Sequence, residues 1–213
     1  MKKACIVGAS KINDASFLQK RKDCYLISCD GGYLCFLNQG MEPDLFIGDF
    51  DTLDKDSLHH PKKVIRLNPV KDDTDTIFAV KTALERGFDT FYFYGCLGGK
   101  LEHTIANLQV LKYLKDREKN GYLIDEDNSQ LVFMLHQEKV SFKKMKAMLS
   151  VFSYSEECTG VTIHGMKYEL KEAVLTNGFP LGVSNQLIDK EDAFIEVEEG
   201  YLLVIAPLAS LDL

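Results

Sequence analysis

Acidic side chains follow two short apolar runs in the first part of the chain. Asp30 follows the run 24–29, and Asp49 and Asp51 follow the run 45–47. Ligands of an open parallel sheet bind beyond the carboxyl ends of its strands, so we expect these three carboxylates in one crevice. In an extended segment Asp49 and Asp51 point to the same side, roughly 7 Å apart, and close carboxylates repel each other unless a cation lies between them. Because Mg²⁺ prefers oxygen ligands, the pattern predicts a magnesium site, and a solvated Asp-rich turn is the alternative.

A second acidic cluster, Lys71-Asp72-Asp73-Thr74-Asp75, precedes an expected helix over 74–86. Asp and Thr at a helix start satisfy free backbone N–H groups and interact favourably with the helix dipole. Three acids in four residues exceed what capping requires. We predict that one or two of them cap the helix, while Asp72 or Asp75 faces the metal and the substrate.

A glycine-rich segment, Gly95-Cys96-Leu97-Gly98-Gly99-Lys100, follows the apolar run 91–94 and opens a second expected helix over 101–117. Backbone N–H groups and the helix dipole favour an anion at such a position, and Lys100 adds a mobile positive charge. The segment is not a Walker A sequence. His103 and Asn107 lie four residues apart and share a helix face, which either looks into the crevice or is a polar flank.

Short apolar runs alternate with helical segments over the first 128 residues. The expected strands are 4–8, 24–29, 45–47, 64–67, 91–94 and 122–124. The expected apolar helix stripes are Ile77, Val80 and Leu84, with Gly87 as the stop, and Leu101, Ile105, Leu108 and Leu111. This alternation predicts an α/β fold with a mostly parallel, Rossmann-like sheet.

The chain from 129 to 213 has a different pattern, with short apolar runs divided by turn residues and no long helix. The expected strands are 131–135, 148–154, 160–164, 173–176, 193–197 and 201–206. The pattern predicts a small antiparallel β domain, a sandwich or a barrel.

Composition limits the class of protein. The 213 residues are 46% hydrophobic and 27% charged, which is typical of a globular protein, and the net charge of −7 argues against a nucleic-acid partner. The six cysteines form no C-x-x-C pair or zinc pattern, so we expect buried free thiols and a cytoplasmic protein. The apolar stretches fall well short of the ~20 residues that a membrane helix needs, and no signal peptide is visible.

The order and spacing of these motifs resemble the thiamin pyrophosphokinase family. The resemblance rests on Asp30-Gly31-Gly32, Gly48-Asp49-Phe50-Asp51-Thr52, Lys71-Asp72-Asp73-Thr74-Asp75 and Gly98-Gly99-Lys100-x-x-His103. In the tail it rests on Gly160-Val161-Thr162, Gly165-Met166-Lys167-Tyr168 and Ser184-Asn185. It extends from about residue 25 to 205.

The resemblance implies a catalytic α/β domain over 1–128, which binds ATP and Mg²⁺, and a thiamin-binding β domain over 129–213. The family works as a homodimer, with thiamin between the catalytic domain of one subunit and the β domain of the other. The implied metal ligands are Asp49, Asp51 and Asp75. The implied catalytic residues are Asp49, Asp51, Lys71, Asp72 and Asp75. The implied ATP-binding residues are Asp30, Gly31, Gly48, Thr52, Thr74, Gly98, Gly99, Lys100 and His103. The implied thiamin-binding residues are Tyr168, Ser184 and Asn185.

Three positions depart from the family pattern. Lys100 and Glu102 stand where the family usually has Arg and Asp, and Lys keeps the charge but loses the bidentate fork. Tyr168 stands where the family often has Trp, and Tyr packs on a flat ring with less area. These departures bear on nucleotide contacts and thiamin affinity and leave the metal carboxylates untouched.

The activity implied is attack of the thiamin hydroxyl on the β-phosphorus of ATP, which expels AMP. Two alternatives remain open at this point. One is a pyrophosphokinase that acts on a hydroxymethyl-dihydropterin, which has no need of Tyr168 and Ser184-Asn185. The other is a non-catalytic regulator that binds thiamin or a nucleotide, which gains nothing from crowded carboxylates.

Overall fold

The computed structural model describes residues 1–48, 61–67, 73–189 and 192–213. The chain divides into two compact units, Met1–Asp127 and Asn128–Leu213, which we call the N-terminal and C-terminal units.

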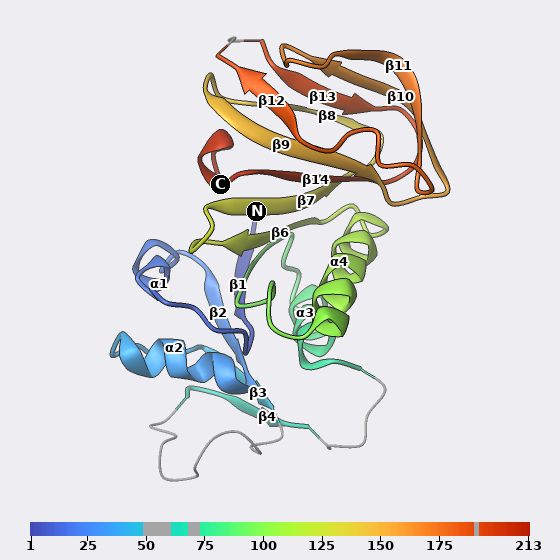
Figure 1. Ribbon diagram of the computed structural model, residues 1–213. Coiled ribbons are helices and arrows are strands. Elements are labelled where there is room, and N and C mark those ends of the chain that lie inside the picture. Colours follow the sequence, from blue (N-terminus) through green and yellow to red (C-terminus); the bar gives the residue numbers. More distant parts are fainter. Residues whose placement is uncertain (49–60, 68–72, 190–191) are drawn as a thin grey trace. The chain divides into compact units, whose positions relative to one another are not determined.

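The N-terminal unit contains a parallel sheet with the strand order β6-β5-β1-β2-β3-β4 (Figure 1). Its strands are β1 (Lys3–Val7), β2 (Tyr25–Cys29), β3 (Leu45–Gly48), β4 (Val64–Arg66), β5 (Thr90–Tyr94) and β6 (Asn120–Asp125). All five neighbouring pairs are parallel. The central strands β3 and β5 are buried along their whole length, as the unbroken apolar runs predict. The predicted mixed α/β class and the six predicted strands of this unit are therefore confirmed.

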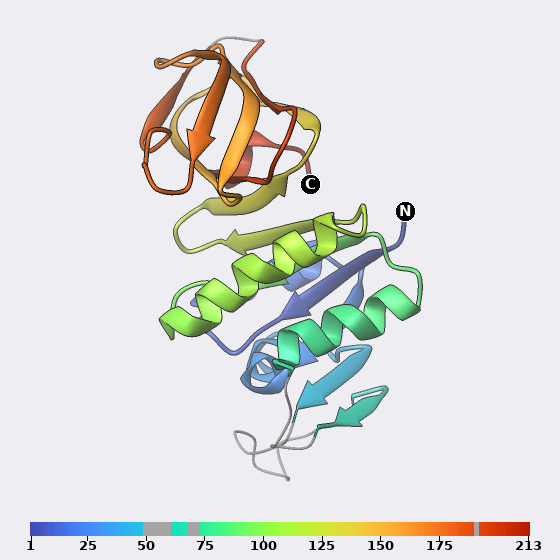
Figure 2. The same cartoon turned by 90° about the vertical axis from the view of Figure 1, so that its right-hand side faces the viewer.

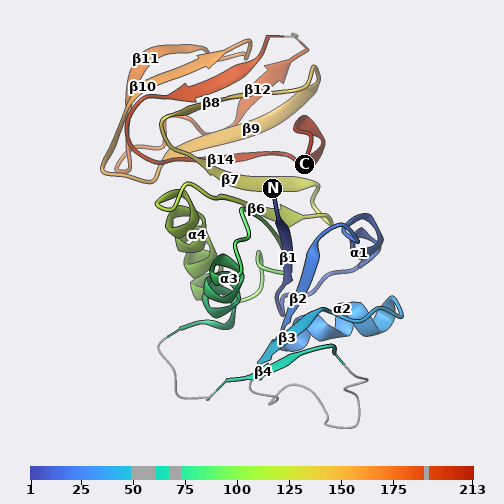
Figure 3. The same cartoon turned by 180° about the vertical axis from the view of Figure 1, so that it is seen from behind.

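Helices cover both faces of this sheet. The helices are α1 (Phe17–Lys20), α2 (Tyr33–Asn38), α3 (Asp75–Glu85) and α4 (Leu101–Lys115). Figures 1 and 3 show α3 and α4 on one face, with α1 and α2 on the other. The sequence predicted α3 and α4 but neither of the short helices α1 and α2.

The predicted apolar stripe of α4 is wrong at its N-terminal end. Leu101 is 71% exposed and Ile105 is 49% exposed, whereas the buried apolar side chains are Val110, Leu111 and Leu114. The helix contacts the sheet through β6, and these buried residues belong to its last two turns. The stripe of α3 also differs, because Ala79, Val80 and Ala83 are its buried residues.

The C-terminal unit contains two sets of strands, with the orders β12-β9-β14-β7 and β11-β10-β13-β8. Figure 2 shows the strands of this unit in the colours from yellow to red. The strands are β7 (Gln130–Leu135), β8 (Glu138–Ser141), β9 (Lys146–Ser153), β10 (Glu157–His164), β11 (Leu170–Thr176), β12 (Asn185–Ile188), β13 (Phe194–Val197) and β14 (Leu202–Pro207). Every described pair within these sets is antiparallel, as predicted. The sequence predicted six of these strands and missed β8 and β12.

One expectation from composition, that of buried free thiols, is met. All six cysteines are free and buried. Burial raises the pKa of the Cys24 thiol to about 11 and that of the Cys96 thiol to about 12. No helix of the described chain has the length and apolar character to span a bilayer.

Candidate active site

Two adjoining cavities lie beyond the carboxyl ends of β1, β2 and β5. One has a volume of ≈ 270 Å³ and the other of ≈ 470 Å³. The two cavities share the lining residues Gly8, Ala9, Asp30, Thr76, His103 and Asn107. We call the two together the crevice. Its position is the one that open parallel sheets use for ligands.

The floor of the crevice is main chain. The amide of Gly8 donates to the Tyr94 carbonyl over 2.8 Å, and a Cβ atom at Gly8 would lie 2.6 Å from the Gly95 carbonyl oxygen. Gly95 itself has φ of +61°, which favours glycine. The segments that follow β1 and β5 therefore approach each other closely only because both positions lack a side chain.

The glycine-rich segment 95–100 forms the wall of the ≈ 470 Å³ cavity, together with Ser10 and Lys11 from the segment after β1. Gly98 and Gly99 have φ of +71° and +66°. The Ser10 amide donates to the Gly95 carbonyl over 3.0 Å, and the Thr104 hydroxyl donates to the Gly98 carbonyl over 3.3 Å.

Lys100 precedes α4 and has an extended backbone (φ −75°, ψ 130°), and its side chain makes no cap hydrogen bond. The first backbone N–H groups of α4 therefore lack a side-chain acceptor at the N-cap, and they lie beside an exposed lysine. This arrangement favours an anionic ligand such as a phosphate.

Asp30 supplies a carboxylate to both cavities from the end of β2. Its φ is +43°, a left-handed conformation that Asp tolerates better than most residues. A Cβ atom at Gly48 would lie only 1.9 Å from Asp30 Oδ1. The carboxylate therefore occupies the space beside the last residue of β3, directly before Asp49 in the chain.

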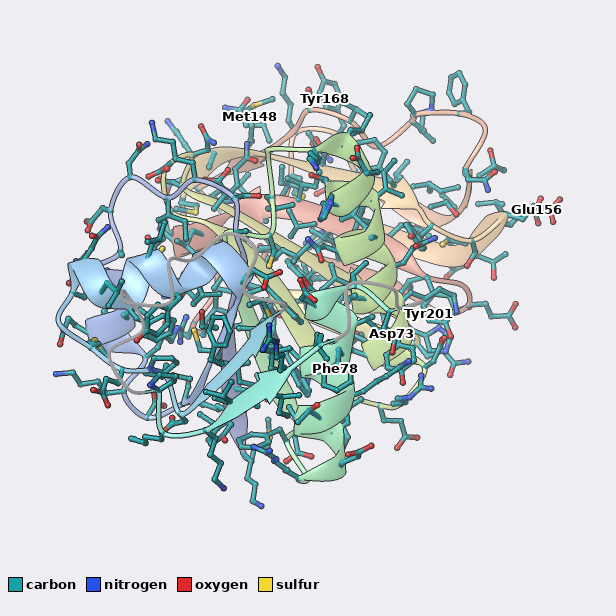
Figure 4. The ribbon with its side chains drawn as sticks, turned by 90° about the horizontal axis from the view of Figure 1, so that it is seen from below. Asp73, Phe78, Met148, Glu156, Tyr168 and Tyr201 are labelled. Atoms are coloured by element: carbon teal, nitrogen blue, oxygen red, sulfur yellow. The ribbon has the colours of Figure 1, made fainter. Side chains whose placement is uncertain are left out.

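The second acidic cluster divides into separate roles at the start of α3. Thr74 is the N-cap, and its Oγ1 accepts from the Ile77 amide at 3.3 Å. Asp73, labelled in Figure 4, forms an ion pair with Lys81 at 2.7 Å. Asp75 lies in the first turn of the helix and lines the ≈ 270 Å³ cavity with Thr74. Among the described acids of the cluster, neither Asp73 nor Asp75 is the N-cap, contrary to the expectation that an acid caps the helix.

Several predicted site residues lie outside the described residues, namely Asp49, Asp51, Thr52, Lys71 and Asp72. Within the described part of the chain no group of three His, Cys, Asp or Glu side chains has the arrangement of a metal site. The described crevice supplies two carboxylates, those of Asp30 and Asp75. Their oxygens are the ligand type that Mg²⁺ prefers, so the described residues fit part of a magnesium site.

The other predicted residues of this region are placed as follows. Gly99, Lys100 and His103 line the crevice, and His103 lies on both cavities. Gly98 lines neither cavity, and its carbonyl accepts from the Thr104 hydroxyl. Gly31 lies in the 3₁₀ turn Asp30–Gly32 and lines neither cavity.

Five lining residues escaped the sequence analysis: Ala9, Ser10, Lys11, Thr76 and Ala106. The run 4–8, which ends in a glycine, pointed to the first three. It forms the central strand β1, so the segment after it lies at the carboxyl-end edge of the sheet, beside the crevice. Thr76 lies in the first turn of α3, and nothing in its type distinguishes it from an ordinary helix residue.

The three predicted thiamin-binding residues lie in the C-terminal unit, where Asn185 contacts Tyr168. Asn185 is 3% exposed, and its side chain accepts from the Tyr168 amide at 3.0 Å and donates to the Tyr168 carbonyl at 2.7 Å. Tyr168 is 59% exposed, and its side chain lies at the periphery in Figure 4. Ser184 has φ of +57° and lines a separate cavity of ≈ 310 Å³ with Met148. Asn185 thus fixes the backbone that presents the Tyr168 ring.

Comparison with known proteins identifies related chains. The profile described as "Thiamin pyrophosphokinase, catalytic domain" matches residues 18–123, and "Thiamin pyrophosphokinase, vitamin B1 binding domain" matches residues 135–202. Thiamine pyrophosphokinase of Bacillus subtilis (strain 168) is 30% identical over 184 residues, which are 84% of this chain and 85% of that protein. A crystal structure of thiamine pyrophosphokinase from Bacillus subtilis matches over 100% of both chains, with a TM-score of 0.85 and 26% identity. The Candida albicans thiamin pyrophosphokinase structure shares the fold, with a TM-score of 0.79 and 16% identity over 96% of this chain and 90% of that one.

Proposed function

Because the chain belongs to the thiamin pyrophosphokinase family, we propose that it transfers the pyrophosphoryl group of ATP to the hydroxyl of thiamin, giving thiamin diphosphate and AMP. The observation that carries this proposal in the structure is the crevice. Carboxylates of Asp30 and Asp75 and the glycine-rich wall with Lys100 line its adjoining cavities. The crevice therefore combines a wall that favours an anion with carboxylate oxygens that can bind a divalent cation. Phosphoryl transfer requires both.

We assign the magnesium ligands to Asp49, Asp51 and Asp75, with Asp30 and Asp72 nearby. Asp75 lines the cavity, and Asp49 follows directly after Gly48, against which the Asp30 carboxylate lies. When bound, Mg²⁺ neutralises charge on the phosphate oxygens of the nucleotide. For the nucleotide we assign Asp30, Gly31, Gly48, Thr52, Thr74, Gly98, Gly99, Lys100 and His103.

The transfer forms a bond between the thiamin hydroxyl oxygen and the β-phosphorus, and it breaks the bond from that phosphorus to the α–β bridging oxygen, which leaves on AMP. The residues of the crevice act mainly by positioning and by stabilising charge. Lys71 and Lys100 add positive charge at the phosphates. Asp72 or Asp75 accepts the proton of the attacking hydroxyl, a role that needs hydrogen-bond reach in the bound complex.

We further propose a cytoplasmic homodimer in which Tyr168, Ser184 and Asn185 of one subunit meet thiamin bound at the crevice of the other. The support is the family membership and the way Asn185 holds the exposed Tyr168. Mixing inactive Asp75→Asn and Tyr168→Ala proteins then restores activity, because the mixed dimer contains one intact site. Two inactive proteins that stay inactive after subunit exchange would contradict the shared site.

The direct test is incubation of the purified protein with ATP, Mg²⁺ and thiamin, with detection of AMP and thiamin diphosphate. Asp51→Asn and Asp75→Asn should lose Mg²⁺-dependent AMP release, and chelation by EDTA should do the same to the wild type. Asp116→Asn is a matched control, because Asp116 pairs with Lys112 at the far end of α4. Product formation with hydroxymethyl-dihydropterin and none with thiamin would favour the pterin enzyme, and thiamin binding without AMP would favour the regulator.

A further inference from the structure

Asn107 is a buried polar side chain on the wall of the crevice. It lies in α4, is 6% exposed, and lines both cavities. Its Nδ2 donates to the Cys96 carbonyl over 2.7 Å. Since a carbonyl only accepts, this bond fixes the orientation of the amide, with nitrogen toward the glycine-rich segment.

The other end of the amide reaches the crevice. Among the described residues no hydrogen-bond donor serves Asn107 Oδ1. The buried side-chain atoms left without a partner in this part of the chain are Ser28 Oγ and Thr90 Oγ1, and Asn107 Oδ1 is not one of them. It therefore keeps access to the open space of the crevice, where it presents a fixed hydrogen-bond acceptor.

An acceptor at this place selects a particular kind of ligand group. The phosphate oxygens of a nucleotide at neutral pH are acceptors, so they cannot serve Oδ1. The thiamin hydroxyl must give its proton to a base during transfer, and a neutral amide oxygen is not a base. The donors that keep their protons are the ribose hydroxyls and base amino group of the nucleotide and the aminopyrimidine amine of thiamin. Asn107 lines the cavity whose wall includes Gly99 and Lys100, which favour a phosphate, so we take the nucleotide as the partner.

We propose that Asn107 is a substrate-binding residue whose Oδ1 accepts a hydrogen bond from a neutral donor of the nucleoside part of ATP. The inference rests on the proposed function and adds to it a residue that recognises the nucleoside rather than the phosphates. Asn107 also holds the glycine-rich wall in place through its hydrogen bond to Cys96. Removal of its side chain therefore affects both the wall and the proposed hydrogen bond to the nucleoside.

Substrate analogues separate these two effects. The values of kcat/KM for ATP, 2′-deoxyATP, 3′-deoxyATP and purine riboside triphosphate are measured with thiamin and Mg²⁺ for the wild type and for Asn107→Ala. We expect the wild type to lose about tenfold with the analogue that lacks the bound donor, the size of one good hydrogen bond. In Asn107→Ala the same analogue should be used as well as ATP, because the partner of the missing donor is already gone.

Thr104→Val is the matched control. Thr104 lies on the same helix and donates to the Gly98 carbonyl of the same wall, but it lines neither cavity. Its loss should reduce kcat/KM equally for ATP and for all three analogues. If Asn107→Ala does not fold, Asn107→Leu replaces it, since leucine has a similar size and carries no acceptor.

The proposal is overturned if all three analogues suffer the same penalty in the Asn107 variant as in the wild type, or if the wild type uses all of them as well as ATP. Failure of the proposed function is distinguishable, because the wild type would then make neither AMP nor thiamin diphosphate from ATP and thiamin.

Discussion

The absence of a side chain at Gly48 leaves the space that the Asp30 carboxylate fills. A Cβ atom there would lie 1.9 Å from Asp30 Oδ1 and 3.0 Å from Asp30 Cγ, whereas ordinary contacts begin at 3.4 Å. In Gly48→Ala the carboxylate must therefore move by about 1.5 Å. Since it is the end of a side chain, a changed rotamer suffices, and the cost in unfolding free energy should be about 0.5–1.5 kcal/mol.

Gly32→Ala provides the contrast, because the obstacle there is backbone. Its Cβ atom would lie 2.2 Å from the Val7 carbonyl oxygen and 2.8 Å from that of Gly8. Relief requires movement of the central strand β1 itself, so we expect a loss of about 3 kcal/mol or more, at the upper end for overpacking. Gly40→Ala is a control for backbone conformation alone, since Gly40 has φ of +59° and open space around it.

The assay is urea unfolding of the three variants beside their rate of AMP release. Gly48→Ala should lose at least about tenfold in kcat/KM, equivalent to 1.4 kcal/mol of transition-state stabilisation, while its unfolding free energy falls by only about 0.5–1.5 kcal/mol. Gly40→Ala should lose stability by about 1–2 kcal/mol and keep its activity. Wild-type kcat/KM in Gly48→Ala would show that the position of the Asp30 carboxylate does not matter for the reaction. A loss of stability in Gly48→Ala as large as in Gly32→Ala would show that the local packing has been misjudged.

Three further predictions follow from the described contacts. Thr74→Ala removes the acceptor for the Ile77 amide and should cost about 1 kcal/mol in urea unfolding, with Thr74→Ser restoring most of it; an unchanged midpoint would contradict the cap. Burial raises the pKa of Cys24 to about 11 and that of Cys96 to about 12, from an ordinary value of 9.0. Between pH 9 and these values the two thiols ionise in the unfolded chain but stay protonated in the folded one, so unfolding releases protons. Stability should be fully present below pH 9 and should fall as pH rises toward 11–12, and a flat dependence of the unfolding midpoint on pH would refute this. Asn185→Ala removes both side-chain hydrogen bonds to the Tyr168 backbone, so it should raise KM for thiamin while KM for ATP stays constant. Tyr168→Trp should lower KM for thiamin, because Trp packs on a flat ring with more area. Equal changes in both KM values would argue against a thiamin-specific role.

The sequence determined the parallel sheet well because its strands are continuous apolar runs. Val64–Arg66, an edge strand with an exposed Val64, was still predicted, since proline and charged residues mark its surroundings. In contrast, β12 (Asn185–Ile188) has only four residues, begins with two amides, and is defined by its pairing with β9. Such a strand forms because a neighbour is available, and no local pattern predicts that.

Helix α4 shows a second limit of local patterns. The spacing of Leu101 and Ile105 fits an apolar stripe, yet both are exposed, and the helix is buried through its later residues Val110, Leu111 and Leu114. Periodicity indicates which side chains share a face, but where the helix meets the sheet decides how much of the face is covered.

The candidate site was predicted in part. The rule that parallel strands carry ligands at their carboxyl ends predicted Asp30 and the glycine-rich segment in one crevice, and the acidic cluster before α3 offered Asp72 or Asp75. The structure brings Asp30, Asp75 and the glycine-rich segment to the crevice. The separate roles of Asp73 and Thr74 could not be predicted, because Asp73 pairs with Lys81, further along α3, which leaves Thr74 to accept from the Ile77 amide. The roles of Asp49, Asp51, Thr52, Lys71 and Asp72 stay predictions.

The main-chain floor of the crevice has a consequence for how such a protein diverges. Where carbonyls and amides of Gly8 and Gly95 form the surface, the shape of the site does not depend on the identity of a side chain. Most neighbouring positions are then free to drift, whereas any β-carbon at these glycines collides with backbone. A saturation library scored for AMP release should therefore show isolated intolerant glycines at positions 8 and 95.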